Sequence, residues 1–208
     1  MRKEEILSEI SKILLPPFEE LGFFSNKKKD NYIKKEDSFE FKFSIYISSV
    51  DIQHLTLSVI NKEIEYLFYR IKSMYINQLQ KEKFRKGMYP ICNLTDWKAL
   101  YKENNLAIGK VWFTMYSSLD EIKQYREEYL IAMGLAFQWF EKCKNLYYVY
   151  LYNLEKETTI SLEMALCIKK FLGYNIDEDY EDIVLRKTNL LGWDKTDFKL
   201  FYNHLKNI

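Results

Sequence analysis

The chain has 208 residues with 31 basic and 30 acidic side chains, so its formal net charge at pH 7 is +1. This near balance argues against a dedicated nucleic-acid-binding protein, which is usually strongly basic. Hydrophobic residues make up 48% of the sequence, and it contains only 6 glycines and 3 prolines. That composition excludes extended disorder, and the chain is long enough to bury a core.

The N-terminal region predicts a helix followed by an antiparallel meander. Apolar residues recur at helical spacing from Ile6 to Leu21, and Gly22 is placed to end the helix. Pro16 and Pro17 should interrupt or kink that helix, because neither can donate an interior hydrogen bond. Residues 39–47 alternate apolar and polar side chains, as a strand with one buried face does. A short strand before them and the similar residues 53–60 after them complete three strands.

The middle of the chain predicts further helices and short strands. Asn61 is placed to cap a helix that runs to about Lys86 and ends at Gly87. Short strands follow within residues 88–94 and 110–116, separated by a polar loop. Ser118 and Glu121 have the spacing of a capping box and should begin a long helix that continues through Cys143.

The last third predicts three helices, near residues 160–172, 177–190 and 195–206, separated at Gly173 and Gly192. The predicted fold is therefore α+β. An antiparallel sheet of about five strands is packed by an N-terminal helix and a long central helix, with a C-terminal helical tail. We place the α+β domain at residues 1–152 and a helical extension at residues 153–208, packed together as one structural unit.

The segment from Met133 to Tyr152 is rich in aromatic residues around Cys143, and it has three interpretations: a binding-site wall, a thiol nucleophile or core. Its apolar residues cover nearly all sides of the predicted helix, which favours core between the sheet and the C-terminal helices. A thiol nucleophile needs a base, and only His54 and His204 are available, without a local signature. Cys143 is therefore predicted to be an inert buried thiol.

The sequence indicates neither a metal site nor a cofactor site. The sequence contains three cysteines, Cys92, Cys143 and Cys167. Their odd number and wide spacing are typical of reduced cytosolic thiols and not of zinc ligands. A glycine-rich phosphate loop and a dinucleotide fingerprint are also missing from the sequence. We expect no metal, no cofactor and no catalytic residues that can be named.

The expected location is the cytoplasm, without membrane contact. Glu4, Glu5 and Glu9 interrupt the apolar stretch that an export signal would need. The best candidate for a membrane span, residues 130–137, is less than half of the roughly 20 residues required.

Five acidic residues lie close together in the sequence "DEDYED": Asp177, Glu178, Asp179, Glu181 and Asp182. The favoured interpretation is a solvated helix N-terminus, where the helix dipole favours negative charge. A second interpretation is an acidic patch that docks a basic partner. A metal site is the weakest of the three, because neighbouring helix positions point apart.

Five lysines form the opposite cluster: Lys27, Lys28, Lys29, Lys34 and Lys35. We interpret them as a solvated hairpin edge that discourages strand pairing. Contact with nucleic acid is the alternative, although the sequence contains no known reading motif, and we do not expect it.

Two segments, "PPFEELGFFSNKKKDNYIKKEDSFEFKFSIYIS" and "QWFEKCKNL", resemble a bacterial domain-of-unknown-function family of small α+β proteins. The resemblance covers approximately Ile6 to Leu151, and the helical tail after Asn153 is longer than we expect of the family. Some members lie in polymorphic-toxin gene neighbourhoods and are thought to act as immunity proteins. The resemblance supplies no catalytic residues and implies that Gly22, Phe23, Trp139, Phe140 and Glu141 are fold markers.

These features together predict a non-enzymatic, cytoplasmic binding protein, an immunity-type inhibitor of a bacterial toxin. Its partner would be a protein, and the acidic residues 177–182 would make the contact. The alternative is a nucleic-acid- or nucleotide-associated enzyme whose site is built from scattered Lys, Tyr and acidic residues. The sequence does not fix the oligomeric state.

Overall fold

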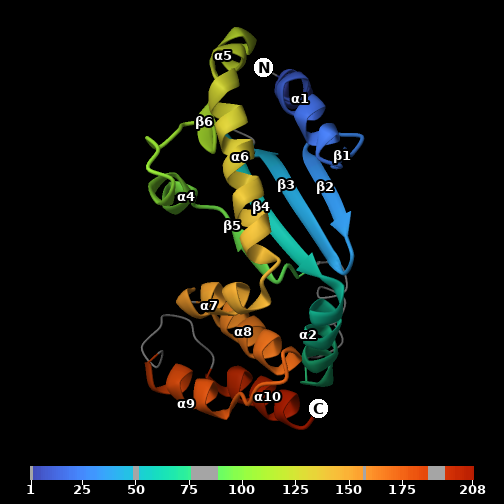
Figure 1. Ribbon diagram of the computed structural model, residues 1–208, viewed down its shortest axis with the longest axis vertical. Coiled ribbons are helices and arrows are strands. Elements are labelled where there is room, and N and C mark those ends of the chain that lie inside the picture. The colour runs from blue at the N-terminus through green and yellow to red at the C-terminus, as the bar shows by residue number, and fades with distance from the viewer. Residues whose placement is uncertain (1, 49–51, 76–88, 157, 187–194) are drawn as a thin grey trace. The chain divides into compact units, whose positions relative to one another are not determined.

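The computed structural model describes residues 2–48, 52–75, 89–156, 158–186 and 195–208 (Figure 1). These residues form an α+β fold with an antiparallel sheet, an N-terminal helix and C-terminal helices, as the sequence predicts. They divide into two compact units. The first unit comprises Met1–Val59 and Asn93–Glu141, and the second comprises Ile60–Cys92 and Lys142–Ile208. The predicted helical extension, residues 153–208, lies within the second unit together with residues 60–92 and 142–152.

The sheet contains the strands β1 (Phe24–Ser25), β2 (Asn31–Glu36), β3 (Phe39–Ile47), β4 (Ile52–Asn61), β5 (Cys92–Leu94) and β6 (Phe113–Met115). The order is β1-β2-β3-β4-β5, and β6 pairs with β4. Tyr32 of β2 stands opposite Phe43 of β3, and His54 of β4 stands opposite Phe113 of β6. The alternation in β3 is confirmed, because its residues Phe41, Phe43, Ile45 and Ile47 are buried while Tyr46 is exposed. β5 and β6 fall within the two short strands that were predicted.

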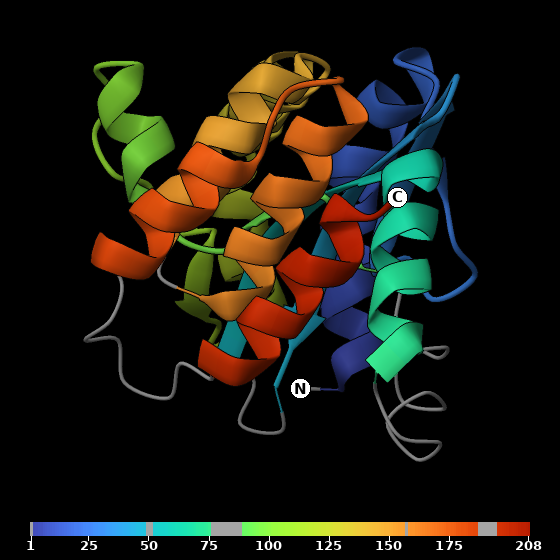
Figure 2. The ribbon, with the colours of Figure 1, turned by 90° about the horizontal axis from the view of Figure 1, so that it is seen from below.

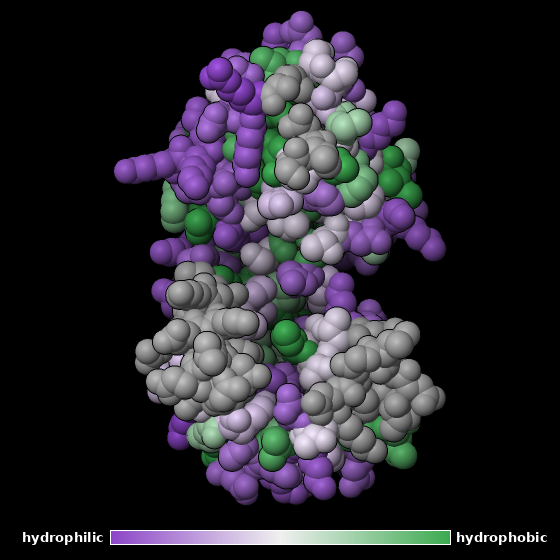
Figure 3. Space-filling model, turned by 180° about the vertical axis from the view of Figure 1, so that it is seen from behind, coloured by the Kyte–Doolittle hydropathy of each residue, from purple (hydrophilic) through white to green (hydrophobic). Residues whose placement is uncertain are grey.

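Helices α1 (Lys3–Glu20) and α6 (Arg126–Cys143) lie across the same face of the sheet (Figure 1). Phe18 of α1 stacks on Tyr32 of β2 with ring centroids 4.5 Å apart. It also meets Phe137 of α6 at 5.6 Å. Phe140 of α6 packs on Phe41 of β3 at 5.4 Å. The opposite face of the sheet is seen from behind in Figure 3.

Of the predicted interruption or kink at Pro16 and Pro17, the interruption is wrong, because α1 is continuous from Lys3 to Glu20. The two prolines leave the carbonyls of Lys12 and Ile13 without their helical donors. Lys12 is exposed and Ile13 is half-buried, so water can reach this side of the helix and solvate those carbonyls. The helix ends as predicted, with Gly22 in the left-handed region at φ 79°.

The long helix predicted after Ser118 is divided at Tyr125 into α5 (Leu119–Gln124) and α6. Ser118 caps α5 by accepting a hydrogen bond from the Glu121 N–H at 3.3 Å. The Glu121 carboxylate accepts hydrogen bonds from the N–H and the hydroxyl of Ser117, both at 2.8 Å. Trp139 and Phe140 of α6 are buried.

The polar loop predicted between β5 and β6 contains a short helix, α4 (Lys98–Glu103). The buried Trp97 precedes it and donates its indole N–H to the Leu55 carbonyl at 2.9 Å. This hydrogen bond ties the segment to β4, so the tryptophan belongs to the core and not to a surface loop.

The second unit is helical, with α2 (Lys62–Tyr75), α7 (Leu146–Glu155), α8 (Thr159–Phe171), α9 (Asp177–Arg186) and α10 (Lys195–Lys206). The Asn61 side chain caps α2 as predicted, accepting from the N–H groups of Glu63 and Ile64 at 3.1 and 3.2 Å. The rest of that predicted helix, residues 76–86, lies outside the described residues, as do residues 187–190 of a later one. Figure 2 shows α2 and α10 beside one another and against α8, and these three helices are in contact.

Helix α7 has no counterpart among the predicted elements. Its N-terminus is capped by the Asn145 side chain, which accepts from Tyr147 N–H at 2.9 Å. The helices of the described residues include none that is both long and apolar enough to cross a membrane.

Candidate functional site

The five acidic residues of the "DEDYED" segment lie in the first two turns of α9, as predicted, but their environments differ. Asp177 and Asp179 are half-buried, whereas Glu178, Glu181 and Asp182 are exposed. The backbone N–H of Asp177 donates to the Asn175 side chain at 3.0 Å, which caps the helix. We call Asp177 and Asp179, which are held by other helices, the inward carboxylates, and the three exposed ones the outward carboxylates.

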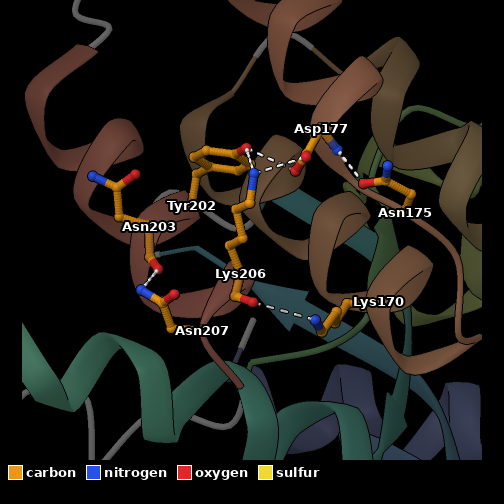
Figure 4. A network of polar contacts seen from close by, with 7 residues as sticks. All are labelled: Lys170, Asn175, Asp177, Tyr202, Asn203, Lys206 and Asn207. Atoms are coloured by element: carbon orange, nitrogen blue, oxygen red, sulfur yellow. Dashed lines mark hydrogen bonds and ion pairs between the residues drawn. The ribbon is translucent and has the colours of Figure 1, made fainter.

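Asp177 joins α9 to α10 through the network in Figure 4. Its Oδ1 accepts a hydrogen bond from the Tyr202 hydroxyl at 2.8 Å, and its Oδ2 accepts from Lys206 Nζ at 2.7 Å. The hydrogen bond from Lys206, followed by that from Tyr202, lowers the pKa of Asp177. Lys170 of α8 donates to the Lys206 carbonyl at 3.5 Å and brings α8 to the same junction. The charge of Asp177 is thus balanced within the protein.

Asp179 joins α9 to α7 and α8 in the same manner. The Tyr150 hydroxyl of α7 donates to Asp179 Oδ1 at 2.7 Å, and Lys169 of α8 forms an ion pair with Oδ2. Burial, followed by the hydrogen bond to Asp179, raises the pKa of Tyr150. Asp177 and Asp179 therefore hold α9 against its neighbouring helices.

A pocket of about 500 Å³ lies beside this acidic helix and is lined by Tyr147, Tyr150, Lys169, Leu172 and Tyr174. Two of its residues, Tyr150 and Lys169, are those that hold Asp179. Tyr147 is 55% exposed and Tyr174 is 58% exposed. Asp182 lies close enough to Tyr150 to contribute to the raised pKa of its hydroxyl. The pocket and the outward carboxylates therefore belong to one surface.

We call this the tyrosine–acid surface and define it by five residues: Tyr147, Tyr174, Glu178, Glu181 and Asp182. The sequence located its acidic residues but placed Tyr147 within a segment interpreted as core. The core interpretation is correct for Val149 and Tyr150, which are buried. A helical projection of α7, had that helix been predicted, would have separated Tyr147 from its buried neighbours.

Cys143 is fully buried, as predicted, and its Sγ lies 3.4 Å from that of Cys92. Burial, followed by the hydrogen bond to Cys143, raises the pKa of the Cys92 thiol. The two histidines occupy other places: His54 packs against Phe113 with centroids 4.6 Å apart, and His204 stacks on Tyr75 at 5.8 Å. The spacing of the cysteines in the sequence gave no sign of their contact.

The five lysines of the predicted hairpin edge also divide into two groups. Lys34 and Lys35 lie in β2 and form ion pairs with Glu36 at 3.4 Å and Glu40 at 3.8 Å. Lys27, Lys28 and Lys29 lie in the turn between β1 and β2, where they are exposed. These three make no ion pair with any residue that the structure describes.

In the described part of the chain, no three His, Cys, Asp or Glu side chains are grouped so that they could hold a metal ion. Glu141, at the end of α6, is exposed and lines a small pocket with Lys34 and Phe137. Comparison of the chain with protein-family models, with curated proteins and with solved structures found no match.

Proposed function

We propose that the protein is a non-enzymatic binding protein that docks a basic protein partner on the tyrosine–acid surface, as an immunity-type inhibitor of a bacterial toxin would. The observation that carries this proposal is the open pocket bordered by exposed tyrosines, beside three exposed carboxylates. Large aromatic side chains that stay more than half exposed beside a cavity are unusual in a core and frequent at protein interfaces.

The tyrosines supply the apolar contact. Tyrosine is enriched among the residues that dominate binding energy, because it presents a large rigid ring and a polar hydroxyl together. The pocket between Tyr147 and Tyr174 can receive a side chain of the partner, and its volume of about 500 Å³ falls in the range of well-formed binding pockets.

The outward carboxylates supply the charge. A toxin that acts on nucleic acid has a positive surface, because it must bind phosphates. Glu178, Glu181 and Asp182 would attract such a surface and accelerate the encounter. The two inward carboxylates support this arrangement, because Asp177 and Asp179 hold α9 against α10, α8 and α7. A helix that is already fixed loses little conformational freedom on binding.

The family resemblance of the segments around Gly22 and Trp139 supports the same function, since some members are thought to be immunity proteins. The candidate partner is a secreted protein encoded beside the gene for this chain. Its toxic domain, expressed in a susceptible bacterial host, should arrest growth, and co-expression of this protein should restore it.

Variants of the surface should lose that protection while remaining folded. We expect Glu178→Lys combined with Glu181→Lys, and separately Tyr147→Ala combined with Tyr174→Ala, to restore growth poorly. The control is Glu19→Lys with Glu20→Lys, which makes the same charge change at exposed positions of α1. Circular dichroism should show similar melting for all variants. Full protection by both surface variants, or none by the parent against the neighbouring gene product, would contradict the proposal.

A further inference from the structure

A strip of aromatic side chains crosses the face of the sheet opposite α1 and α6. The alternation in β3 turns Tyr46 away from the buried Phe43 and Ile45. Tyr46 lies next to His54 of β4, with ring centroids 6.1 Å apart, and His54 lies next to Phe113 of β6 at 4.6 Å. Tyr46 is 58% exposed and Phe113 is 49% exposed. We call these three residues the aromatic strip.

The strip ends beside the turn that carries the unpaired lysines. The Ile45 N–H donates to the Asp30 carbonyl at 2.8 Å, which places Lys29 and its neighbours next to the Tyr46 position. Lys3 at the start of α1 connects the two features, because its Nζ lies 5.8 Å above the Tyr46 ring. The aromatic strip and the lysine turn thus meet at Lys3 in the first unit.

A pocket of about 490 Å³ lies at this end of the surface. Its lining includes Lys3, Lys27, Lys28 and Lys29, with Glu4 and Asp30 as its acidic members. The Asp30 carboxylate is occupied by the side-chain amides of Asn26 at 2.7 Å and Asn31 at 2.5 Å. The lysines of the turn make no ion pair with a described residue, in contrast to Lys34 and Lys35. Their charge is available to a ligand.

We propose that the aromatic strip and the lysine pocket together bind a single strand of nucleic acid. Exposed bases would stack on Tyr46 and Phe113, and the phosphates would lie against Lys3 and the lysine turn. Proteins that bind single-stranded nucleic acid without sequence preference combine two features. Aromatic rings stack on the bases, and positively charged side chains contact the phosphate backbone. A duplex keeps its bases within its own stack, so it cannot use the rings.

This inference goes beyond the proposed function and uses other residues, in the other unit. The small net charge of the chain implies binding of modest strength that depends on salt. The site needs no catalytic group, so the inference concerns binding alone.

Fluorescence anisotropy with a labelled oligo(dT) of about 15 nucleotides tests the inference, since single-strand sites span roughly 4–16 nucleotides. The purified full chain should bind this strand at a salt concentration of about 50 mM more tightly than a duplex of equal length. Tyr46→Ala and Phe113→Ala should each weaken binding by about 5- to 150-fold, the range for loss of one base–aromatic stack. The control is Tyr66→Ala, which removes an exposed tyrosine on α2 and should leave the affinity unchanged.

The lysines are tested by the salt dependence. Lys27→Gln, Lys28→Gln and Lys29→Gln together should reduce the slope of log affinity against log salt concentration by about 2, the value for three phosphate contacts on a single strand. Lys62→Gln, Lys98→Gln and Lys199→Gln, at exposed positions elsewhere, form the matched control. The proposal is wrong if the parent fails to bind at about 50 mM salt. It is also wrong if both strip variants bind as tightly as the parent. If the parent self-associates and those variants do not, the rings belong to a protein interface.

Discussion

Lys72 and Glu163 form an ion pair inside the second unit, where the Glu163 side chain has no exposed surface. The rings of Phe68, Tyr75 and Phe201 surround the ammonium group, with centroids 5.4–5.9 Å from Nζ. Burial raises the pKa of Glu163 to about 7, because desolvation outweighs the attraction to Lys72. Such a pair contributes little net stability and makes stability depend on pH.

The sign of that pH dependence follows from proton binding. Between the usual value of 4.5 and about 7, the folded protein keeps a proton on Glu163 that the unfolded chain has lost. The contribution of this group is therefore fully present below pH 4.5 and is lost as the pH rises through about 7. We expect the free energy of unfolding to fall by up to about 3 kcal/mol across this range.

Glu163→Gln should flatten this slope, as measured by urea unfolding at several pH values. Its absolute stability should also fall, because the buried Lys72 loses its carboxylate partner, so the slope and not the midpoint is the readout. Glu155→Gln, at an exposed position of α7, should keep the slope of the parent. The interpretation of Glu163 fails if the slope is the same with and without its carboxyl group.

The three cysteines should be unreactive in the folded protein. All three are buried, and burial raises the pKa of the Cys92 and Cys167 thiols, which keeps them protonated. A thiol reagent such as dithionitrobenzoate should modify them only in denaturant, where three equivalents should react. Rapid modification of one equivalent in native buffer would reopen the possibility of a reactive cysteine.

Among the elements, β3 shows how the alternation of apolar and polar side chains determines which face of a strand is buried. Phe41 is buried against Phe140, whereas Lys42 lies on the other face and is half-buried. Phe41→Ser should lower the free energy of unfolding by at least about 3–5 kcal/mol, the cost of removing a buried aromatic ring. Lys42→Ser should change it by less than about 0.5 kcal/mol. Denaturant unfolding of both variants measures this, and equal effects would show that the strand is buried on both sides.

The elements that the sequence predicted are those with a local signal. Three such signals each affect only residues that are close in the sequence. They are the alternation in β3, the Asn61 cap of α2 and the glycine after α1. Helix α7 escaped prediction because its tyrosines and Val149 favour strands in isolation, and packing in the second unit overrides that preference. The continuity of α1 through Pro16 and Pro17 depends on carbonyls that face water, which a linear sequence does not show.

In the candidate site, too, only the local features could be predicted from the sequence. The sequence placed five carboxylates at a helix start, which is correct. It could not separate the inward pair from the outward three, because their partners come from other helices. Asp177 is held by Tyr202 and Lys206 of α10, and Asp179 by Lys169 of α8. Contacts between residues distant in the sequence decide which of the five carboxylates are held by other helices.

At the scale of the whole molecule, the fold class was predictable and the division into units was not. Each unit is built from two separate parts of the chain, because residues 60–92 join 142–208 and residues 93–141 join 1–59. A single boundary in the sequence, such as that between residues 152 and 153, cannot describe two units that each contain two separate segments. The tyrosine–acid surface lies wholly in the second unit, and the aromatic strip lies wholly in the first.

We propose that the outward carboxylates steer a basic partner to the tyrosine–acid surface. The most direct test is the association rate constant with the purified toxic domain, measured by stopped-flow fluorescence at low and high salt. Glu178→Lys with Glu181→Lys is the test variant. Asp179 is left unchanged, because its ion pair with Lys169 holds α9 in place.

We predict that association of the parent slows markedly as salt rises, because the attraction between charges is screened. The test variant should associate more slowly at low salt and depend little on salt, with a smaller change in the dissociation rate. Glu19→Lys with Glu20→Lys should follow the parent. Equal association rates for the parent and the test variant at both salt concentrations would contradict the claim and leave the acidic residues as an ordinary solvated helix start.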